Sequence, residues 1–484
     1  MSSPVSSRNS KSSHPEAPKE EAVTETILSN TLEYEQQLHS AAPKLHGRKL
    51  TAAIAFVAGT GFTLFGYDQG VMSALLSAKQ TSTVPSYHAE CSPAAKRGSF
   101  IMIEGSLITF GIMVSYWIDF ALFWASGSSA QWRVPIALQI VFAMIMIAGI
   151  LYVSHEVVTL TASRSLKISA QLPESPRWLA KEGRNIEALA VICALEDKPY
   201  DDPLVQQTYL GIREAVAVES GSDTGRSSLR EIFTGGRSQN FRRAFLGVVN
   251  QCFQQITGIN LITYYATLLF ERLGIDDVKS RIIAACNGTE YFLASLIAIF
   301  IIDRIGRRKL MLFGAVGQCL TMVLLAILGS IDNSAAQIVS AVLLFVFNSF
   351  FAVGWLGMTW LYPAEIVGLR IRAPANAFST ASNWIFNFMV VMVTGPSFNN
   401  ISWGTYIALN AFIIPVVYFF FPETAGRSLE DMDVVFALAY NEGVSPVQVS
   451  LRKDVPLAGT PEADEILGLR SRHDEVKVDK REKE

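Results

Sequence analysis

The chain has 484 residues, of which 50% are hydrophobic and only 17% are charged, and its formal net charge is −3. Mean hydropathy is +0.30, and no basic stripe indicates nucleic-acid binding. The five cysteines show no CxxC spacing, so they predict neither a metal site nor a disulfide framework. We therefore expect an all-α polytopic membrane protein without cofactor or metal.

Residues 1–48 are rich in Ser, Glu and Pro and have no apolar core, which predicts a disordered cytosolic tail rather than a cleaved signal peptide. Beyond this tail, nine apolar runs reach or approach the ~20 residues that a helix needs to cross a bilayer. They are 52–76, 99–124, 132–153, 243–270, 281–302, 309–330, 336–361, 377–396 and 404–421.

These runs divide the chain into five parts. The N-tail is followed by an N-terminal helical bundle, a central cytosolic loop, a C-terminal six-helix bundle and a cytosolic C-tail. The predicted boundaries are 1–48, 49–153, 154–240, 241–421 and 422–484.

Asp68 lies deep in the first apolar run, "AAIAFVAGTGFTLFGYDQGVMSALL". An ionised carboxylate in hydrocarbon is costly, so a functional role is the first interpretation. If its cationic partner can move away, the carboxyl group becomes a proton carrier. The alternative is a residue near the end of the span, capped by backbone and water.

An internal repeat indicates that part of the first half is missing. Glu90 precedes Arg97 by seven residues, and Glu365 precedes Arg372 by the same spacing. About 100 residues separate the polar first span of the second half from Glu365, whereas only 22 separate Asp68 from Glu90. The first half therefore lacks about three spans, and we expect nine spans of an original twelve.

The missing spans have a consequence for topology. Because residues 78–93 are too polar to return through the bilayer, span 99–124 is expected to run opposite to the first span. Residues 153–171, "VSHEVVTLTASRSLKISAQ", have the features of a translated intron, so a faulty gene or splice form is one explanation. A natural short variant with a real loop insertion is the other.

The run "NQCFQQITGINLITYY" contains an unusual density of polar side chains, among them Gln254, Gln255, Asn260 and Tyr265. Amide groups in hydrocarbon need partners. Helix–helix hydrogen bonds or the hydroxyls of a neutral ligand can supply them. Because the run contains no charged residue, it favours an uncharged polyhydroxylated solute over an amino acid or a phosphate.

Two later runs add indoles and an amide, at Trp360, Asn383 and Trp384. Aromatic rings that stack on C–H faces, beside amides that bind hydroxyls, are typical of carbohydrate sites. Packing at the membrane interface is the alternative for a single tryptophan.

Several charged residues are expected at the cytosolic ends of the spans. "DRIGRRK" (303–309) joins two spans and is predicted to be cytosolic by its cations. We interpret the charges of this loop and of the repeated Glu–Arg pairs as an ion-pair gate, with plain topogenic charge as the alternative. The predicted gate residues are Glu90, Arg97, Asp303, Arg304, Arg307, Arg308, Glu365 and Arg372.

The motifs FGYDQG, PESPR, QQxxGIN, DRxGRR, YPAE, SNW and PETAGRSLE together resemble the sugar porter family of the major facilitator superfamily. The likeness covers about residues 51–436 apart from the gap and the suspected insert, and is greatest to the fungal branch that contains glycerol–proton symporters. It implies two six-helix bundles with alternating access and a central site. By motif, the sugar-contacting positions are Gln254, Gln255, Asn260, Trp360, Asn383 and Trp384, and Asp68 matches the proton-coupling aspartate.

Three hexose-binding positions of the family differ here, because Gly105, Tyr291 and Ala352 replace a glutamine, an asparagine and an acid. Tyr291 is kept as a candidate binding residue, and the differences favour a smaller polyol. The resemblance implies a proton-coupled symporter of a neutral sugar or polyol such as glycerol, not an enzyme, acting as a monomer in the plasma membrane. An uncoupled facilitator and a non-transporting truncated product are the alternatives.

Overall fold

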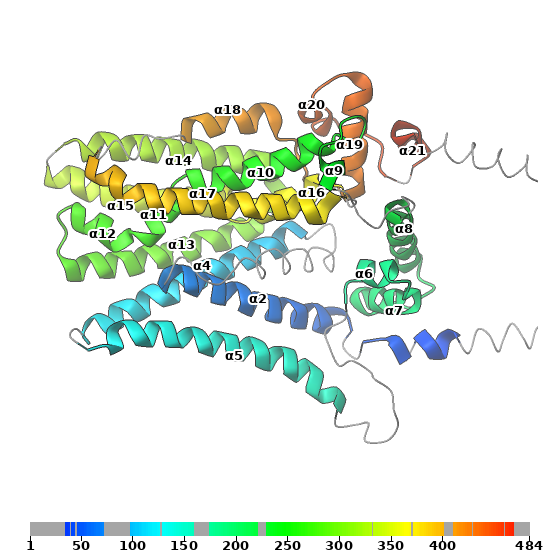
Figure 1. Ribbon diagram of the computed structural model, residues 1–484, viewed down its shortest axis with the longest axis horizontal. Coiled ribbons are helices and arrows are strands. Elements are labelled where there is room, and N and C mark those ends of the chain that lie inside the picture. The colour runs from blue at the N-terminus through cyan, green and yellow to red at the C-terminus, as the bar shows by residue number, and fades with distance from the viewer. Residues whose placement is uncertain are drawn as a thin grey trace, which may run out of the picture.

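The computed structural model describes residues 34–38, 40–43, 46–71, 97–125, 128–158, 174–220, 229–331, 333–368, 371–400, 410–427, 429–458 and 460–468. Within these ranges the protein is helical and contains no strand. The N-terminal half contributes three long helices: α2 (Gly47–Val71), α4 (Arg97–Phe123) and α5 (Ala130–Val158). These three helices contact one another, and α4 packs against α13 of the C-terminal bundle, while α5 lies on the far side of α2 and α4 (Figure 1).

The C-terminal bundle is larger and contains interrupted helices. Six helices or helix pairs among the described residues are long and apolar enough to cross a membrane, so the predicted polytopic fold is confirmed, while the count of nine spans stays a prediction. The elements are α10 (Asn240–Ile256), α11 (Ile259–Tyr264), α12 (Ala266–Arg272), α13 (Asp277–Ile305), α14 (Arg307–Gly329), α15 (Ser334–Gly354), α16 (Met358–Ile366), α17 (Arg372–Asn400) and α18 (Asn410–Phe420).

Two of the predicted spans are broken near the middle of the bundle. The run 243–270 forms α10, α11 and α12. The first break falls at Gly258, which has φ +92°, a left-handed conformation that glycine adopts at little steric cost. The run 336–361 forms α15 and α16 with a break at Trp355–Gly357. Broken helices free backbone groups, and in membranes these are tolerated where protein or a cavity surrounds them.

The first two long helices, α2 and α4, run in the same direction, contrary to the expectation that span 99–124 would run opposite to the first. Both begin at the end of the bundle where α6–α8 lie (Figure 1). A side chain added at Gly59 would meet Leu107, and one added at Gly66 would meet the Ile108 backbone. The two helices pack closely along these glycines, and α4 also packs against α13. Residues 72–96 lie outside the described part.

Helices also occupy the predicted loop and the predicted tails. The central helices pack in small apolar clusters, and Leu38 of the N-tail joins one of them, so this part of the tail is ordered. Three further helices, α19 to α21, follow the bundle and share an apolar cluster of their own. The bounds are α6 (Pro176–Lys181), α7 (Asn185–Glu196), α8 (Pro203–Ser220), α9 (Leu229–Ile232), α19 (Leu429–Glu442), α20 (Pro446–Ser450) and α21 (Pro461–Leu467).

Candidate functional site

A cavity lies between the N-terminal helices and the C-terminal bundle. It has about 40 Å³ of space open to the centres of water molecules, which is room for about three waters. Its walls come from α2 and α4 on one side and from α10, α11, α13, α15, α16 and α17 on the other. The lining residues are Phe65, Ile108, Ile112, Gln254, Gln255, Ile259, Asn260, Thr263, Tyr291, Phe351, Leu356, Trp360 and Asn383.

The polar wall of the cavity is a network of amides that joins α10 to α17. Asn383 donates through Nδ2 to Gln251 Oε1 at 2.6 Å and to Gln254 Oε1 at 2.7 Å. Gln255 donates through Nε2 to the same Gln254 oxygen at 3.2 Å. Gln251 is itself anchored, because its Nε2 donates to the Thr359 carbonyl at 2.9 Å. The network thus joins side chains of α10 and α17 to each other and to a backbone carbonyl of α16.

The break at Gly258 extends this network into α11. It brings Asn260 close to Gln255, and the Asn260 Nδ2 donates to Gln255 Oε1. The same Nδ2 donates to Asn387 Oδ1 on α17 at 2.8 Å. Gln254, Gln255, Asn260 and Asn383 are all less than 10% exposed, so their hydrogen bonds replace those that water would otherwise make.

The chemistry of the lining is neutral. Among the described lining residues no side chain carries a charge. Amides both donate and accept, and rings such as Trp360 and Tyr291 offer flat apolar faces. Such a wall matches a solute that has hydroxyl groups and no net charge.

The structure brings most of the predicted binding residues together. Six line the cavity: Gln254, Gln255, Asn260, Tyr291, Trp360 and Asn383.

Two predicted binding residues do not line the cavity, and one predicted residue cannot be placed against it. Trp384 lies behind the wall, edge-on to Phe65 with ring centroids 6.2 Å apart. Tyr265 is directed toward α17, where its hydroxyl faces the Val391 carbonyl at 3.5 Å. Asp68 belongs to α2, but its side chain lies outside the described part.

Sequence reasoning missed the apolar half of the lining. Phe65, Ile108 and Ile112 come from the N-terminal helices, and Leu356 comes from the break between α15 and α16. Ile108 and Ile112 are one turn apart on α4, a spacing that could have indicated a lining stripe. Gln251 and Asn387, which support the amides from behind, carry the same polar signal as the predicted residues.

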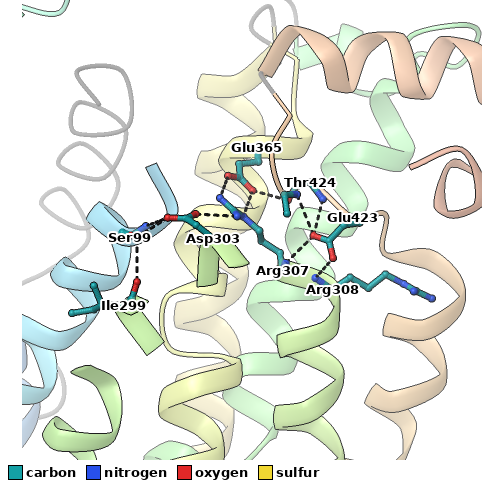
Figure 2. Close-up of polar contacts among 9 residues, drawn as sticks. Ser99, Ile299, Asp303, Arg307, Arg308, Glu365, Glu423 and Thr424 are labelled. Atoms are coloured by element: carbon teal, nitrogen blue, oxygen red, sulfur yellow. Dashed lines mark hydrogen bonds and ion pairs between the residues drawn. The ribbon is translucent and has the colours of Figure 1, made fainter. Parts of the chain in front are cut away.

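A second constellation lies at the cationic end, by which we mean the bundle end that carries residues 303–309. Figure 2 shows Arg307 paired with Glu365 through two bonds, Nε to Oε2 at 3.2 Å and Nη2 to Oε1 at 3.1 Å. These side chains are 4% and 5% exposed. Arg307 also pairs with Asp303 at 3.1 Å, and Thr424 donates to Glu365 Oε2 at 2.6 Å.

Glu423 connects this end to the chain that follows α18. Its carboxylate accepts the backbone N–H groups of Arg307 at 2.8 Å and Arg308 at 3.2 Å. It thereby caps the first turn of α14, where a negative charge is favoured. Gly306 makes this approach possible, because a Cβ there would lie 2.6 Å from Glu423 Oε2 and the residue has φ +98°.

The cationic end also links the two halves. Ser99 on α4 donates through Oγ to Asp303 Oδ2 at 2.5 Å and through its backbone N–H at 3.1 Å (Figure 2). Sequence reasoning missed Ser99, Glu423 and Thr424. The last two belong to the PETAGRSLE motif, which was the available signal.

The predicted gate is therefore only partly assembled. Asp303, Arg307 and Glu365 meet, whereas Arg304 is exposed. Arg308 donates to the Tyr418 carbonyl at 2.7 Å, and Arg372 donates to the Val367 carbonyl at 3.3 Å. Glu90 and the Arg97 side chain lie outside the described residues.

Comparisons with known proteins agree with this architecture. Residues 79–155 and 160–436 match the family described as "Sugar (and other) transporter". The chain is 39% identical over 375 residues to "Sugar transporter STL1" of Saccharomyces cerevisiae, covering 76% of this chain and 62% of STL1. It is 35% identical over 422 residues to "Major facilitator superfamily transporter mfsA" of Aspergillus fumigatus, covering 85% and 72%. The chain thus spans less than two thirds of the length of STL1.

The fold has solved counterparts. The proton:xylose symporter XylE, bound to 6-bromo-6-deoxy-D-glucose, superposes with a TM-score of 0.59 at 21% identity, covering 80% of this chain and 83% of XylE. These relatives are named as transporters, in agreement with the prediction that the chain is not an enzyme. The chain is a multi-pass membrane protein and belongs to the sugar transporter family of the major facilitator superfamily.

Proposed function

We propose that the protein carries a small uncharged polyhydroxylated solute, a sugar or a polyol such as glycerol, across the plasma membrane together with protons. It does so by alternating access and as a monomer surrounded by lipid. The observation that carries this proposal is the neutral, amide-walled cavity between the two groups of helices. STL1 is named as a sugar transporter and XylE as a proton:xylose symporter, which supports the same class of solute.

The dimensions of the cavity favour a polyol smaller than a hexose. The Tyr291 ring occupies part of the wall. At Gly105, where the family resemblance implies a glutamine, an added Cβ would already lie 3.2 Å from Leu356 Cγ. The described lining residues from α4 are the apolar Ile108 and Ile112, and the space beside them suits glycerol.

Alternating access requires contacts between the two halves that can break. The seam between α4 and α13 has hydrogen bonds at three depths. Besides Ser99–Asp303 at the cationic end, Thr109 and Ser295 share a bond of 3.0 Å, and Trp117 Nε1 donates to Thr289 Oγ1 at 2.9 Å. Side-chain bonds of this kind contribute about 1 kcal/mol each in membranes, so either end can open at modest cost.

Uptake into proteoliposomes tests the proposal. Glycerol uptake should alkalinise the outer medium, and glucose should be taken up more slowly. Asp68→Asn should keep glycerol exchange and lose accumulation against a gradient, because the proton carrier is gone. Uptake without any change of pH would support the uncoupled facilitator instead.

The alternative that the chain is a truncated, non-transporting product is tested separately, by sequencing the transcript. The predicted gap near residue 80 and residues 159–171 of the suspected insert lie outside the described residues, whereas α5 continues to Val158. Sequencing across codons 76–84 and 152–172 should recover about three spans and remove the insert. A transcript that encodes the chain as printed would establish the short variant.

A further inference from the structure

A polar cluster lies between α13 and α15, outside the cavity, with Asn287 and Asn348 buried and Glu290 and Ser349 half-buried. Asn348 donates through Nδ2 to Asn287 Oδ1 at 2.7 Å. One turn along α13, the hydroxyl of Ser349 donates to Glu290 Oε1. The cluster therefore contains one carboxyl group, two amides and one hydroxyl, shared equally by the two helices.

The cluster has unused hydrogen-bonding capacity. Among the described residues, Glu290 Oε2, Asn287 Nδ2 and Asn348 Oδ1 are buried and have no partner. Asn287 and Asn348 are each 2% exposed. Buried polar atoms without partners are rare because each is costly. Their concentration around one carboxyl group indicates a site with a function.

Among the described residues no cation faces this carboxyl group at its own level of α13. Arg281 lies roughly 13 Å along the helix and pairs with Asp277 at 3.0 Å. Glu290 lies at the middle of α13, roughly 20 Å along the helix from the charged residues of the cationic end. No residue of α15 is titratable, and the charged residues of α12 and α14 lie at the ends of those helices. The groups that face this level are phenols, Tyr291 on α13 and Tyr116 on α4, with Asp119 one turn further out.

The cluster lies directly behind the cavity wall. Tyr291 follows Glu290 in the chain, and Phe351 lies two residues after Ser349. Both rings line the cavity and meet at 6.2 Å between centroids. A change in the cluster that separates α13 from α15 would therefore move the aromatic pair that closes this side of the cavity.

We propose that Glu290 is a second proton-binding site, on the C-terminal bundle, and that its proton exchanges with water when the cavity opens. The inference rests on the proposed proton-coupled transport. In the closed form the proton is on Oε2, while Oε1 accepts from Ser349. Release transfers the proton to water and leaves Glu290 as a carboxylate. The negative charge of this carboxylate is stable only when water reaches the cluster past Tyr291 and Phe351.

Infrared spectroscopy tests the protonation directly. The full chain in nanodiscs at neutral pH should show a band of protonated carboxylic acid, and Glu290→Gln should remove part of its intensity. Glutamine has the same shape and can still accept from Ser349, so this variant should fold. Glu271→Gln, which changes an exposed carboxylate on the neighbouring α12, should leave the band unchanged. An unchanged band in Glu290→Gln would overturn the proposal.

Transport tests the role of the proton. Glu290→Gln should exchange glycerol within about twofold of the wild-type rate and accumulate it at least tenfold less, while Glu271→Gln behaves as wild type. Accumulation by Glu290→Gln equal to that of the wild type would overturn the role of Glu290 alone. If the wild type itself moves glycerol without protons, the proposed proton coupling as a whole is wrong. That result differs from a coupled wild type with an unaffected Glu290→Gln variant, which rules out the role of Glu290 alone.

Discussion

The Arg307–Glu365 pair allows a quantitative prediction for Glu365→Gln. The pair is bidentate, with bonds of 3.2 and 3.1 Å, and both side chains are at most 5% exposed. Removing one partner of a buried pair costs about 3–5 kcal/mol, because a buried charge is left uncompensated. Since Arg307 keeps Asp303 at 3.1 Å, we expect the lower end, about 3 kcal/mol, which is a population change of about 100-fold.

Hydrogen–deuterium exchange measures this change where it should occur. In Glu365→Gln, amides in the first turn of α14 should exchange about 100-fold faster, because their cap on Glu423 opens with the pair. Arg304→Gln is the matched control: it removes an exposed cation from the same loop and should change exchange less than threefold. Equal exchange in Glu365→Gln and wild type, or equal acceleration by Arg304→Gln, would refute the argument that the buried pair closes this end.

Three further predictions address neighbouring features. Gly306→Ala should lower the melting temperature by several degrees, since its Cβ would lie 2.6 Å from Glu423 Oε2; unchanged melting contradicts this. Arg243→Gln should speed proteolysis within α19–α21, because Arg243 pairs with Asp433 at 2.5 Å and covers the Phe436 ring; cleavage at the wild-type rate contradicts it. Leu356→Ala should raise xylose uptake relative to glycerol about tenfold by enlarging the cavity; an unchanged ratio contradicts it.

The polar half of the site could be predicted from sequence. Each amide side chain in an otherwise apolar run can be recognised by itself. Gln254, Asn260 and Asn383 could therefore be identified without knowledge of their spatial neighbours. The structure places them in one network of hydrogen bonds, while their role in binding a solute stays a prediction. The prediction was possible because an amide without a hydrogen-bond partner is costly in hydrocarbon, so each amide in an apolar run indicates a partner nearby.

The apolar half and the helix directions depend on packing between distant segments. The spacing of Ile108 and Ile112 indicates one face of α4, but the sequence does not say whether that face lines a cavity or packs against another helix. The predicted direction of α4 is likewise wrong: the polarity of residues 78–93 carries no information on the close contacts between α2 and α4 at Gly59 and Gly66. The Glu423 cap escaped notice because its acceptor function depends on a loop that approaches α14 from 116 residues away.

The central claim, that the amide network binds the solute, is tested most directly by glycerol binding to the purified protein. Tryptophan fluorescence reports the event, because Trp360 lines the cavity. Asn383→Leu removes the bonds to Gln251 and Gln254 and should raise the half-saturating glycerol concentration at least tenfold. Asn400→Leu, at the exposed end of the same helix, should leave it unchanged. Wild-type binding by Asn383→Leu would contradict the account.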